Sequence, residues 1–155
     1  MSNSVEIAAV TATLRNFIET NIQSTVDLGD TQVTVQHPGT ARELLTSNQV
    51  NVFLYQVLSG ALTATPPLTL QLCYLITAYG RSDDQILEQR LLARVISILH
   101  DNPVLTVNEN NVNENQPAQL RIAWQPMPIE ALSNLWIAFQ TPYRVSATYQ
   151  IRTAT

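Results

Sequence analysis

The run from Pro66 to Leu105 constrains the fold of this chain more than any other part, because it predicts a long strand, a capped helix and a return segment in direct succession. Successive side chains of a strand point to opposite faces of a sheet. In residues 68–79 the even positions are Leu, Leu, Leu, Tyr, Ile and Ala, so this face is expected to pack into the core. The odd positions, from Thr69 to Tyr79, mix polar and apolar side chains. We therefore expect the second face to lie under another element or a neighbouring subunit.

The helix that follows this strand carries signals at both ends. Ser82 followed by Gln85 matches a capping box, and the two aspartates between them suit the positive end of the helix dipole. Apolar residues recur at spacings of three and four between positions 87 and 99, and Pro103 follows the last of them. The pattern predicts a helix that ends just before Pro103.

The rest of the chain shows the periodicities of two more helices and several strands. A helix is predicted from Ile7 to Ile22, with Asn3 and Glu6 as its capping box. A further helix begins near Pro128, and strands are predicted at residues 31–36, 50–58, 120–125 and 143–152. The strands at 50–58 and 68–79 are expected to be antiparallel neighbours, because only Pro66-Pro67 and a short stretch separate them. The asparagine-rich residues 107–119 predict a mobile loop or a hairpin tip.

Together these elements predict an α+β fold. We expect one domain over residues 1–155, with a mixed, mostly antiparallel sheet and about three helices packed mainly on one of its faces. A chain of 155 residues is long enough to build one hydrophobic core.

Several arginines lie on predicted polar faces. Arg90 and Arg94 are on the side of their helix that faces away from the apolar stripe, which is either a solvated face or a contact surface. In the strand at 143–152 the odd positions are apolar or aromatic, and the even positions include Arg144 and Arg152. One face of this strand is expected to pack, while the other is wet or meets a partner.

The charge pattern excludes two classes of partner. The chain has no lysine and carries eight arginines against twelve acidic residues, for a net charge of -4. This composition lacks the basic footprint of a nucleic-acid binder and the polybasic segment of a membrane-surface protein. Charged residues make up only 13% of the chain, which suits a protein that buries surface against protein partners.

The single cysteine, Cys73, excludes an internal disulfide framework and a multi-cysteine zinc site, and it indicates folding in a reducing compartment. The N-terminal residues lack a positively charged leader, and no apolar run reaches the length of a membrane span. We therefore expect the protein to be cytoplasmic and soluble at synthesis.

No residue pattern predicts catalysis, a metal or a cofactor. His100 and Asp101 are adjacent at a helix end, where a histidine suits the helix dipole, and His37 lies in a turn beside Pro-Gly. Cys73 lies within an apolar strand, where a thiol is less reactive. The known nucleotide-binding, hydrolase and calcium motifs are absent from the sequence, so we expect a protein that is not an enzyme.

Three blocks of the sequence carry a family resemblance. The first joins PPLTLQLCYLITAYG to LLARVISILHDNPVL, the second is LSNLWIAFQTPYRVSATYQIR, and VNVFLYQV near residue 50 is a weaker third. In their order and spacing they resemble the N-terminal domain of cap, or tail-terminator, proteins of phage-tail-like extracellular contractile injection systems.

The resemblance implies a structural, tail-terminator-like cap that forms a homo-oligomer, expected to be a hexameric ring, at the end of the inner tube and sheath. Such a ring stops polymerisation and fixes tail length, in contact with sheath and inner tube proteins and with a possible second cap paralogue. The particle is then either released or held in the cell. The candidate interface residues are Arg90, Arg94, Arg144, Arg152, Tyr143 and Tyr79. A monomeric ligand-binding α+β module and, less favoured, a small hydrolase are the alternatives.

Overall fold

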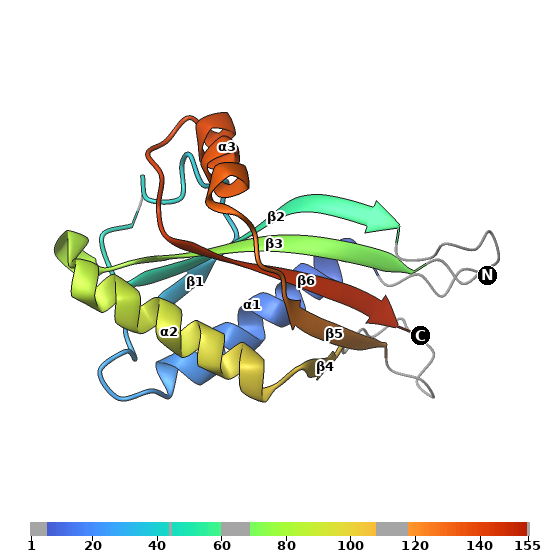
Figure 1. Ribbon diagram of the computed structural model, residues 1–155. Coiled ribbons are helices and arrows are strands. Elements are labelled where there is room, and N and C mark those ends of the chain that lie inside the picture. The colour runs from blue at the N-terminus through green and yellow to red at the C-terminus, as the bar shows by residue number, and fades with distance from the viewer. Residues whose placement is uncertain (1–5, 44, 60–68, 108–117, 155) are drawn as a thin grey trace.

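The computed structural model describes residues 6–43, 45–59, 69–107 and 118–154 (Figure 1). Within these ranges the chain forms one mixed six-stranded sheet and three α-helices, which confirms the predicted α+β fold. The strands lie in the order β1 (Gln32–Thr34), β2 (Gln49–Ser59), β3 (Leu70–Tyr79), β6 (Ser146–Ala154), β5 (Gln119–Trp124) and β4 (Val104–Thr106). Only β1 and β2 are parallel; the other neighbours are antiparallel.

The predicted long strand is β3, which lies in the middle of the sheet between β2 and β6. Its pairing with β2 confirms the expected antiparallel neighbours, with Val52 opposite Ile76. Both of its faces are buried from Leu72 to Tyr79. A central strand covered on both faces is expected to be apolar throughout, and this explains the apolar content of its odd positions.

Two helices cover one face of the sheet and the third lies on the other (Figure 1). The first face packs on α1 (Ile7–Gln23) and α2 (Gln85–Asp101), whose Leu14, Ile18, Leu91 and Val95 form a continuous core with Leu72, Tyr74 and Ile76. On the second face, α3 (Ile129–Phe139) packs on Leu75 through Leu132, Trp136 and Phe139. The mixed face of β3 therefore does lie under another element, as predicted, and that element is α3.

The N-terminal cap of α2 differs from the prediction. Residues Arg81–Asp83 form a short 3₁₀ helix, η1, and Ser82 has a positive φ of 58°. The capping side chain is that of Asp84, whose Oδ1 accepts hydrogen bonds from the backbone N–H groups of Ile86 and Leu87, each at 3.1 Å. The capping box at Ser82 is therefore wrong. The helix begins later because the chain first turns tightly over Gly80.

The first helix begins at Ile7, as predicted, whereas the predicted loop and the last strand have different bounds. The first helix starts after Glu6, which makes no side-chain capping bond, and Asn3 lies outside the described residues. Most of the predicted loop, residues 108–117, lies outside them too; at its edges Val107 and Ala118 are buried and hydrogen-bonded, and Gln119 belongs to β5.

The last strand is shorter than predicted. It begins at Ser146 rather than Tyr143, so Tyr143 and Val145 are exposed instead of packed in the core. The reason is that residues 141–145 leave the sheet and line a cavity beside α2.

Candidate functional site

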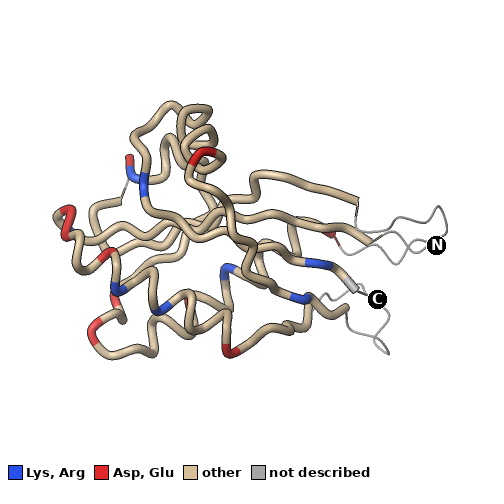
Figure 2. The backbone as a smooth tube through the Cα atoms, in the orientation of Figure 1, with Lys and Arg blue, Asp and Glu red and all other residues tan. Residues whose placement is uncertain are grey.

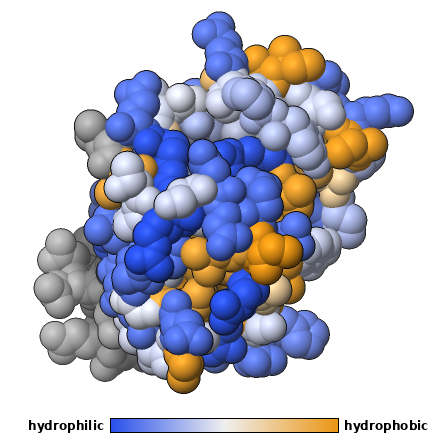
Figure 3. All heavy atoms as spheres, turned by 90° about the vertical axis from the view of Figure 1, so that its left-hand side faces the viewer, coloured by the Kyte–Doolittle hydropathy of each residue, from blue (hydrophilic) through white to orange (hydrophobic). Residues whose placement is uncertain are grey.

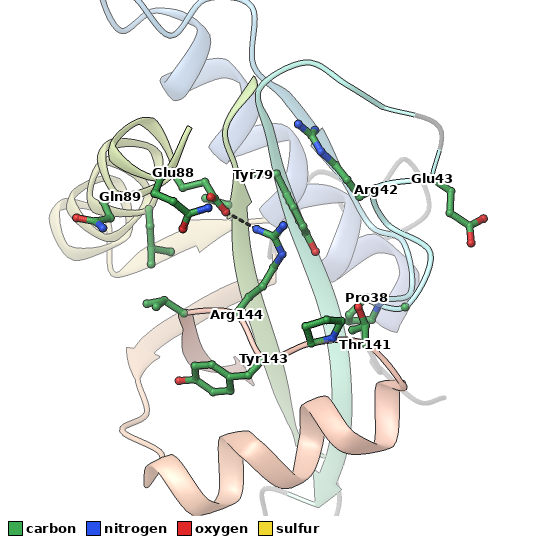
Figure 4. A pocket seen from close by; sticks show the side chains of 15 residues that line it. Pro38, Arg42, Glu43, Tyr79, Glu88, Gln89, Thr141, Tyr143 and Arg144 are labelled. Carbon is green, nitrogen blue, oxygen red and sulfur yellow. Dashed lines mark hydrogen bonds and ion pairs between the residues drawn. The ribbon is translucent and has the colours of Figure 1, made fainter. Parts of the chain in front are cut away.

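A cavity of about 610 Å³ opens where β3 ends and α2 begins. Three segments far apart in the sequence surround it: residues 38–43, the first two turns of α2, and residues 141–145 (Figure 4). Tyr79 forms part of its wall from the sheet. The site is thus assembled only when the loop before β2 and the segment before β6 both reach the same end of the sheet.

Two arginines flank the Tyr79 ring. The guanidinium carbon of Arg144 lies 4.4 Å from the ring centroid, and that of Arg42 lies 5.5 Å from it. Both distances are within cation–π range, where the contact contributes about 0.5–2 kcal/mol. Arg144 also forms an ion pair with Glu88 of α2, drawn as a dashed line in Figure 4. Residues from β3, α2 and the segment before β6 are therefore joined through one arginine.

Burial sets the electrostatics of this cluster. The Glu88 side chain is 12% exposed, and burial raises the pKa of its carboxyl although the Arg144 charge opposes the rise. Burial likewise raises the pKa of the Tyr79 hydroxyl, again against the nearby arginine charge. One carboxylate oxygen of Glu88, Oε2, is buried and has no hydrogen-bond partner among the described residues. The Arg144 charge therefore favours the ionised form of Glu88 and opposes the effect of burial on its pKa.

Arg42 is held in place by a set of backbone carbonyls and one buried amide. Its guanidinium donates to the carbonyl oxygen of Gly80 at 3.0 Å and to Oε1 of Gln49 at 3.2 Å. Gln49 is fully buried, and its Nε2 donates to the carbonyl oxygen of Ala41 at 2.8 Å. These hydrogen bonds connect the loop before β2 to the end of β3. They also provide the buried amide of Gln49 with hydrogen-bond partners, which buried polar groups require.

Gly80 allows the tight turn that joins β3 to α2. A Cβ atom at this position would lie 2.3 Å from the carbonyl oxygen of Asp84, which no side chain can tolerate. The turn directs α2 back along the sheet, so that Glu88 faces Tyr79 and Arg144.

The structure brings together three of the six predicted interface residues. Tyr79, Tyr143 and Arg144 all line the cavity. Arg90 is exposed on α2, and the Nε of Arg94 donates to Oγ1 of Thr25 at 2.9 Å, so both lie away from the cavity. Arg152 is exposed near the far end of β6.

Sequence reasoning missed Arg42, Gln49 and Glu88. Glu88 follows two aspartates at the start of a helix, where an acidic residue is ordinary, and Arg42 lies in a segment without periodicity. The only available signal was the amide pair Asn48-Gln49 directly before a strand, since buried amides often fasten loops.

The residues that could have suggested catalysis have structural surroundings. His37 packs edge-on against Phe53 and Phe139, with ring centroids 5.4 and 5.5 Å apart. His100 is exposed in the last turn of α2. Cys73 is buried, and burial raises the pKa of its thiol.

Neither a metal cluster nor a membrane span is found in the described ranges. Within them, His, Cys, Asp and Glu side chains do not gather in a group that could hold a metal ion. None of the helices in the same ranges combines the length and the apolar character that crossing a bilayer requires.

Exposed apolar side chains border the cavity. Ile86 is 69% exposed and Val145 is 68% exposed, and Tyr143 also faces outward. Figure 3 views this end of the molecule and shows apolar atoms gathered beside strongly hydrophilic ones. An aromatic and arginine cluster with an apolar border is typical of protein–protein contact surfaces. The arrangement can therefore bind a partner, whereas a nucleophile with an adjacent base is absent from the residues that line it.

One family model matches almost the whole chain. The model of the Pvc16 N-terminal domain matches residues 9–155. No protein of described function matches the sequence itself at a significant level.

Among solved structures, the PVC sheath/tube terminator of an extracellular contractile injection system, in its extended state, has a TM-score of 0.69 at 14% identity. The tube-terminating cap of the anti-feeding prophage has a TM-score of 0.62 at 17% identity. The fold match covers 98% and 99% of this chain, but only 58% and 57% of those two chains.

Proposed function

Because the chain belongs to the Pvc16 N-terminal domain family, we propose that it is a structural cap of a contractile injection system, which ends the inner tube and sheath and thereby fixes their length. The observation that carries this proposal is the fold correspondence with two terminating caps over nearly the whole chain. Both of those proteins are parts of assembled particles, which supports sheath and inner tube proteins as partners here.

A ring of identical subunits is the assembly that best suits this role, and we propose six copies. A closed ring uses two different patches on each subunit, one for each neighbour. The described surface offers several apolar side chains that are more than two-fifths exposed, among them Val26, Ile86, Ile129, Ile137 and Val145. These side chains come from the turn after α1, the start of α2, α3 and the segment before β6, so their exposure supports contacts through more than one element.

The cavity and its border form the first candidate contact surface. Tyr79 and Arg144 provide a rigid aromatic and cationic centre, and Tyr143 provides an exposed aromatic side chain. The second candidate is the outer side of α2 around Arg90 and Arg94. A non-enzymatic role, synthesis in the cytoplasm and the presence of a second cap protein in the same particle belong to the same proposal.

Electron microscopy of particles that carry a labelled copy of the chain tests the proposal. We expect the label at one end of each particle and nowhere along the sheath. Label along the whole particle, or particles without label, would contradict the assignment as a cap.

Charge reversal tests the two candidate surfaces separately. We expect Arg144→Glu and Arg94→Glu to reduce the fraction of capped particles, with Arg15→Glu on α1 as a reversal outside both surfaces. Fully capped particles from both variants would contradict a role for these surfaces.

A second function is favoured by the size of the cavity. At about 610 Å³ it lies within the usual range of small-molecule sites, and Arg42, Arg144 and Glu88 converge on it. A monomeric ligand-binding module is therefore the alternative. Light scattering separates the two, because a ring has a multiple of the chain mass and a ligand-binding module has the mass of one chain.

A further inference from the structure

Two arginines lie side by side on the sheet without an anionic partner. Arg121 of β5 and Arg152 of β6 occupy directly opposite positions in the register, and both are exposed. Like charges at opposite positions on neighbouring strands repel each other. Neither arginine takes part in an ion pair or a side-chain hydrogen bond within the described part of the chain. Among the described residues this repulsive pair has no acidic partner, and a bound anion or an acidic partner would relieve the repulsion.

These arginines belong to a row that crosses five strands. Register pairs connect Leu58 to Gln71, Gln71 to Arg152, Arg152 to Arg121, and Arg121 to Val104. We call these five residues the arginine row. Its two end members are apolar and exposed, Leu58 at 38% and Val104 at 44%.

None of the helices in the described part of the chain covers the arginine row. It lies on the sheet face opposite α1 and α2, because the neighbouring residues Leu120 and Ile151 point into the core with those helices. On the arginine face α3 packs against Leu75, farther along β3. In Figure 1 α3 lies over the other end of the sheet from the end of β6 and the start of β5. The row is therefore open to another molecule.

Acidic side chains gather at the opposite end of the molecule. There η1 and the turn between α1 and β1 lie together, joined by an ion pair of 3.4 Å between Arg81 and Asp30. Asp27 and Asp83 are exposed in these two turns, and neither has an ion-pair partner among the described residues. Figure 2 shows red segments where β3 leads into α2 and blue segments along β5 and β6.

Apolar side chains accompany these carboxylates. Val26 is 80% exposed beside Asp27, and Ile86 is 69% exposed just after the capping residue Asp84. We call Val26, Asp27, Asp83, Asp84 and Ile86 the acidic corner. Like the arginine row, it combines exposed apolar surface with charged side chains, of which Asp27 and Asp83 have no ion-pair partner among the described residues.

Distance prevents the two groups from meeting within one molecule. Gln71, beside Arg152, is near the start of β3, whereas Arg81 and Asp83 follow its end. A strand of this length spans roughly 30 Å at about 3.3 Å per residue. Charges this far apart in water are screened at physiological ionic strength, where the Debye length is about 8 Å. The carboxylates of the acidic corner can therefore pair with Arg121 and Arg152 only when the two groups belong to different copies of the chain.

We propose that the arginine row of one copy docks on the acidic corner of a second copy in a head-to-tail contact. This inference rests on the proposed ring and names the surfaces that form it. The two patches differ and lie at opposite ends of the sheet, so the contact is heterologous and repeats from copy to copy, closing into a ring when the rotation allows. Carboxylates of the corner pair with Arg121 and Arg152, and the exposed apolar residues of both patches pack beneath them.

Sedimentation of the purified chain and its charge-reversal variants tests the contact. We expect the wild-type chain to self-associate, and Arg152→Glu to weaken this association by at least about tenfold, since like charges placed across an interface are strongly unfavourable. Arg15→Glu makes the same change of charge on α1, outside both patches and outside the two candidate surfaces above, and should leave association unchanged. Circular dichroism verifies that each variant is folded.

Complementary reversal provides the sharper test. Asp83→Arg alone should weaken association as Arg152→Glu does, and Asp83→Asn should weaken it less while retaining a residue that tolerates the positive φ of 56°. An equimolar mixture of the Arg152→Glu and Asp83→Arg chains should associate again, because each end then meets the opposite charge.

Equal loss from Arg15→Glu, no rescue in the mixture, or a wild-type chain that stays monomeric at the highest attainable concentration would overturn the inference. Capping is measured separately, from the position of the labelled chain on particles. A wild-type chain that caps particles while its Arg152→Glu variant caps them equally well refutes the contact and leaves the capping role intact. Absence of capping by the wild-type chain refutes the proposed function itself.

Discussion

Arg144 is the residue whose removal most directly tests how the cavity is built. Its side chain is 30% exposed and its partner Glu88 is 12% exposed. Removing one member of a fully buried ion pair costs about 3–5 kcal/mol, whereas an exposed pair contributes no more than about 1 kcal/mol. The intermediate burial places the loss of the ion pair near 2 kcal/mol, and the stacking on Tyr79 adds up to about 1 kcal/mol. Arg144→Ala should therefore lower the free energy of unfolding by about 2–3 kcal/mol, which is roughly 5–10 °C in Tm for a domain of this size.

The reason for this loss is the carboxylate that remains behind, so the loss must depend on Glu88. In a Glu88→Gln background no buried charge is left unpaired, and Arg144→Ala should then cost only about 1 kcal/mol, mainly from the Tyr79 contact. Urea denaturation of the wild type, both single variants and the double variant measures this coupling. Equal losses in the two backgrounds would refute the reasoning.

The same carboxyl gives a pH dependence of known sign. The native pKa of Glu88 is raised above its ordinary value of 4.5, so its ionisation opposes folding. Its contribution to stability is therefore most favourable below the unfolded pKa and declines as the pH rises through the raised native pKa. Without Arg144 the pKa rises further, and the deficit of Arg144→Ala should be larger at about pH 8 than at about pH 4. A deficit that is constant or larger in acid would refute this account.

Three further predictions concern the turn into α2 and the buried thiol. Gly80→Ala should lower the free energy of unfolding by about 1–3 kcal/mol, because its Cβ would lie 2.3 Å from a backbone oxygen. Gly29→Ala, whose Cβ would lie 3.4 Å from its nearest neighbour, should change the Tm little. Equal effects of the two variants on the Tm would contradict the close approach at Gly80. Asp84→Ala should cost about 1 kcal/mol by thermal unfolding and Ser82→Ala almost nothing, and the reverse order would restore the capping box predicted from the sequence. Cys73 should react with an alkylating reagent only as fast as the protein unfolds, and rapid labelling of the native chain would contradict its burial.

The parts of the fold that follow from periodicity could be predicted. The alternation in β3 and the apolar stripe of α2 each reflect which side of an element packs, and this is a local property of the sequence. That the second face of β3 is covered could also be predicted from its mixed side chains, although the sequence does not identify α3 as the element that covers it. Boundaries were less secure, as at Asp84 and Ser146, because tight turns and departures from the sheet depend on distant neighbours.

The cavity could be predicted only in part. Tyr79, Tyr143 and Arg144 were candidates because the alternating pattern of the sequence placed them in predicted strands, whereas Arg42 and Glu88 come from segments without such a pattern. Arg42 and Glu88 meet at one site because the buried amide of Gln49 and the tight turn at Gly80 bring their segments together. The spacing of residues in the sequence does not predict this proximity. The pairing of Arg121 with Arg152 could not be predicted from the sequence either, because it depends on the register between β5 and β6.

The length distribution of particles assembled with and without this chain tests the capping role most directly. Electron microscopy of particles from cells with and without its gene gives the measurement. We predict uniform, closed particles when the chain is present, and tubes and sheaths of widely varying length with open ends when it is absent. Particles of the same uniform length in its absence would contradict the assignment as a terminating cap.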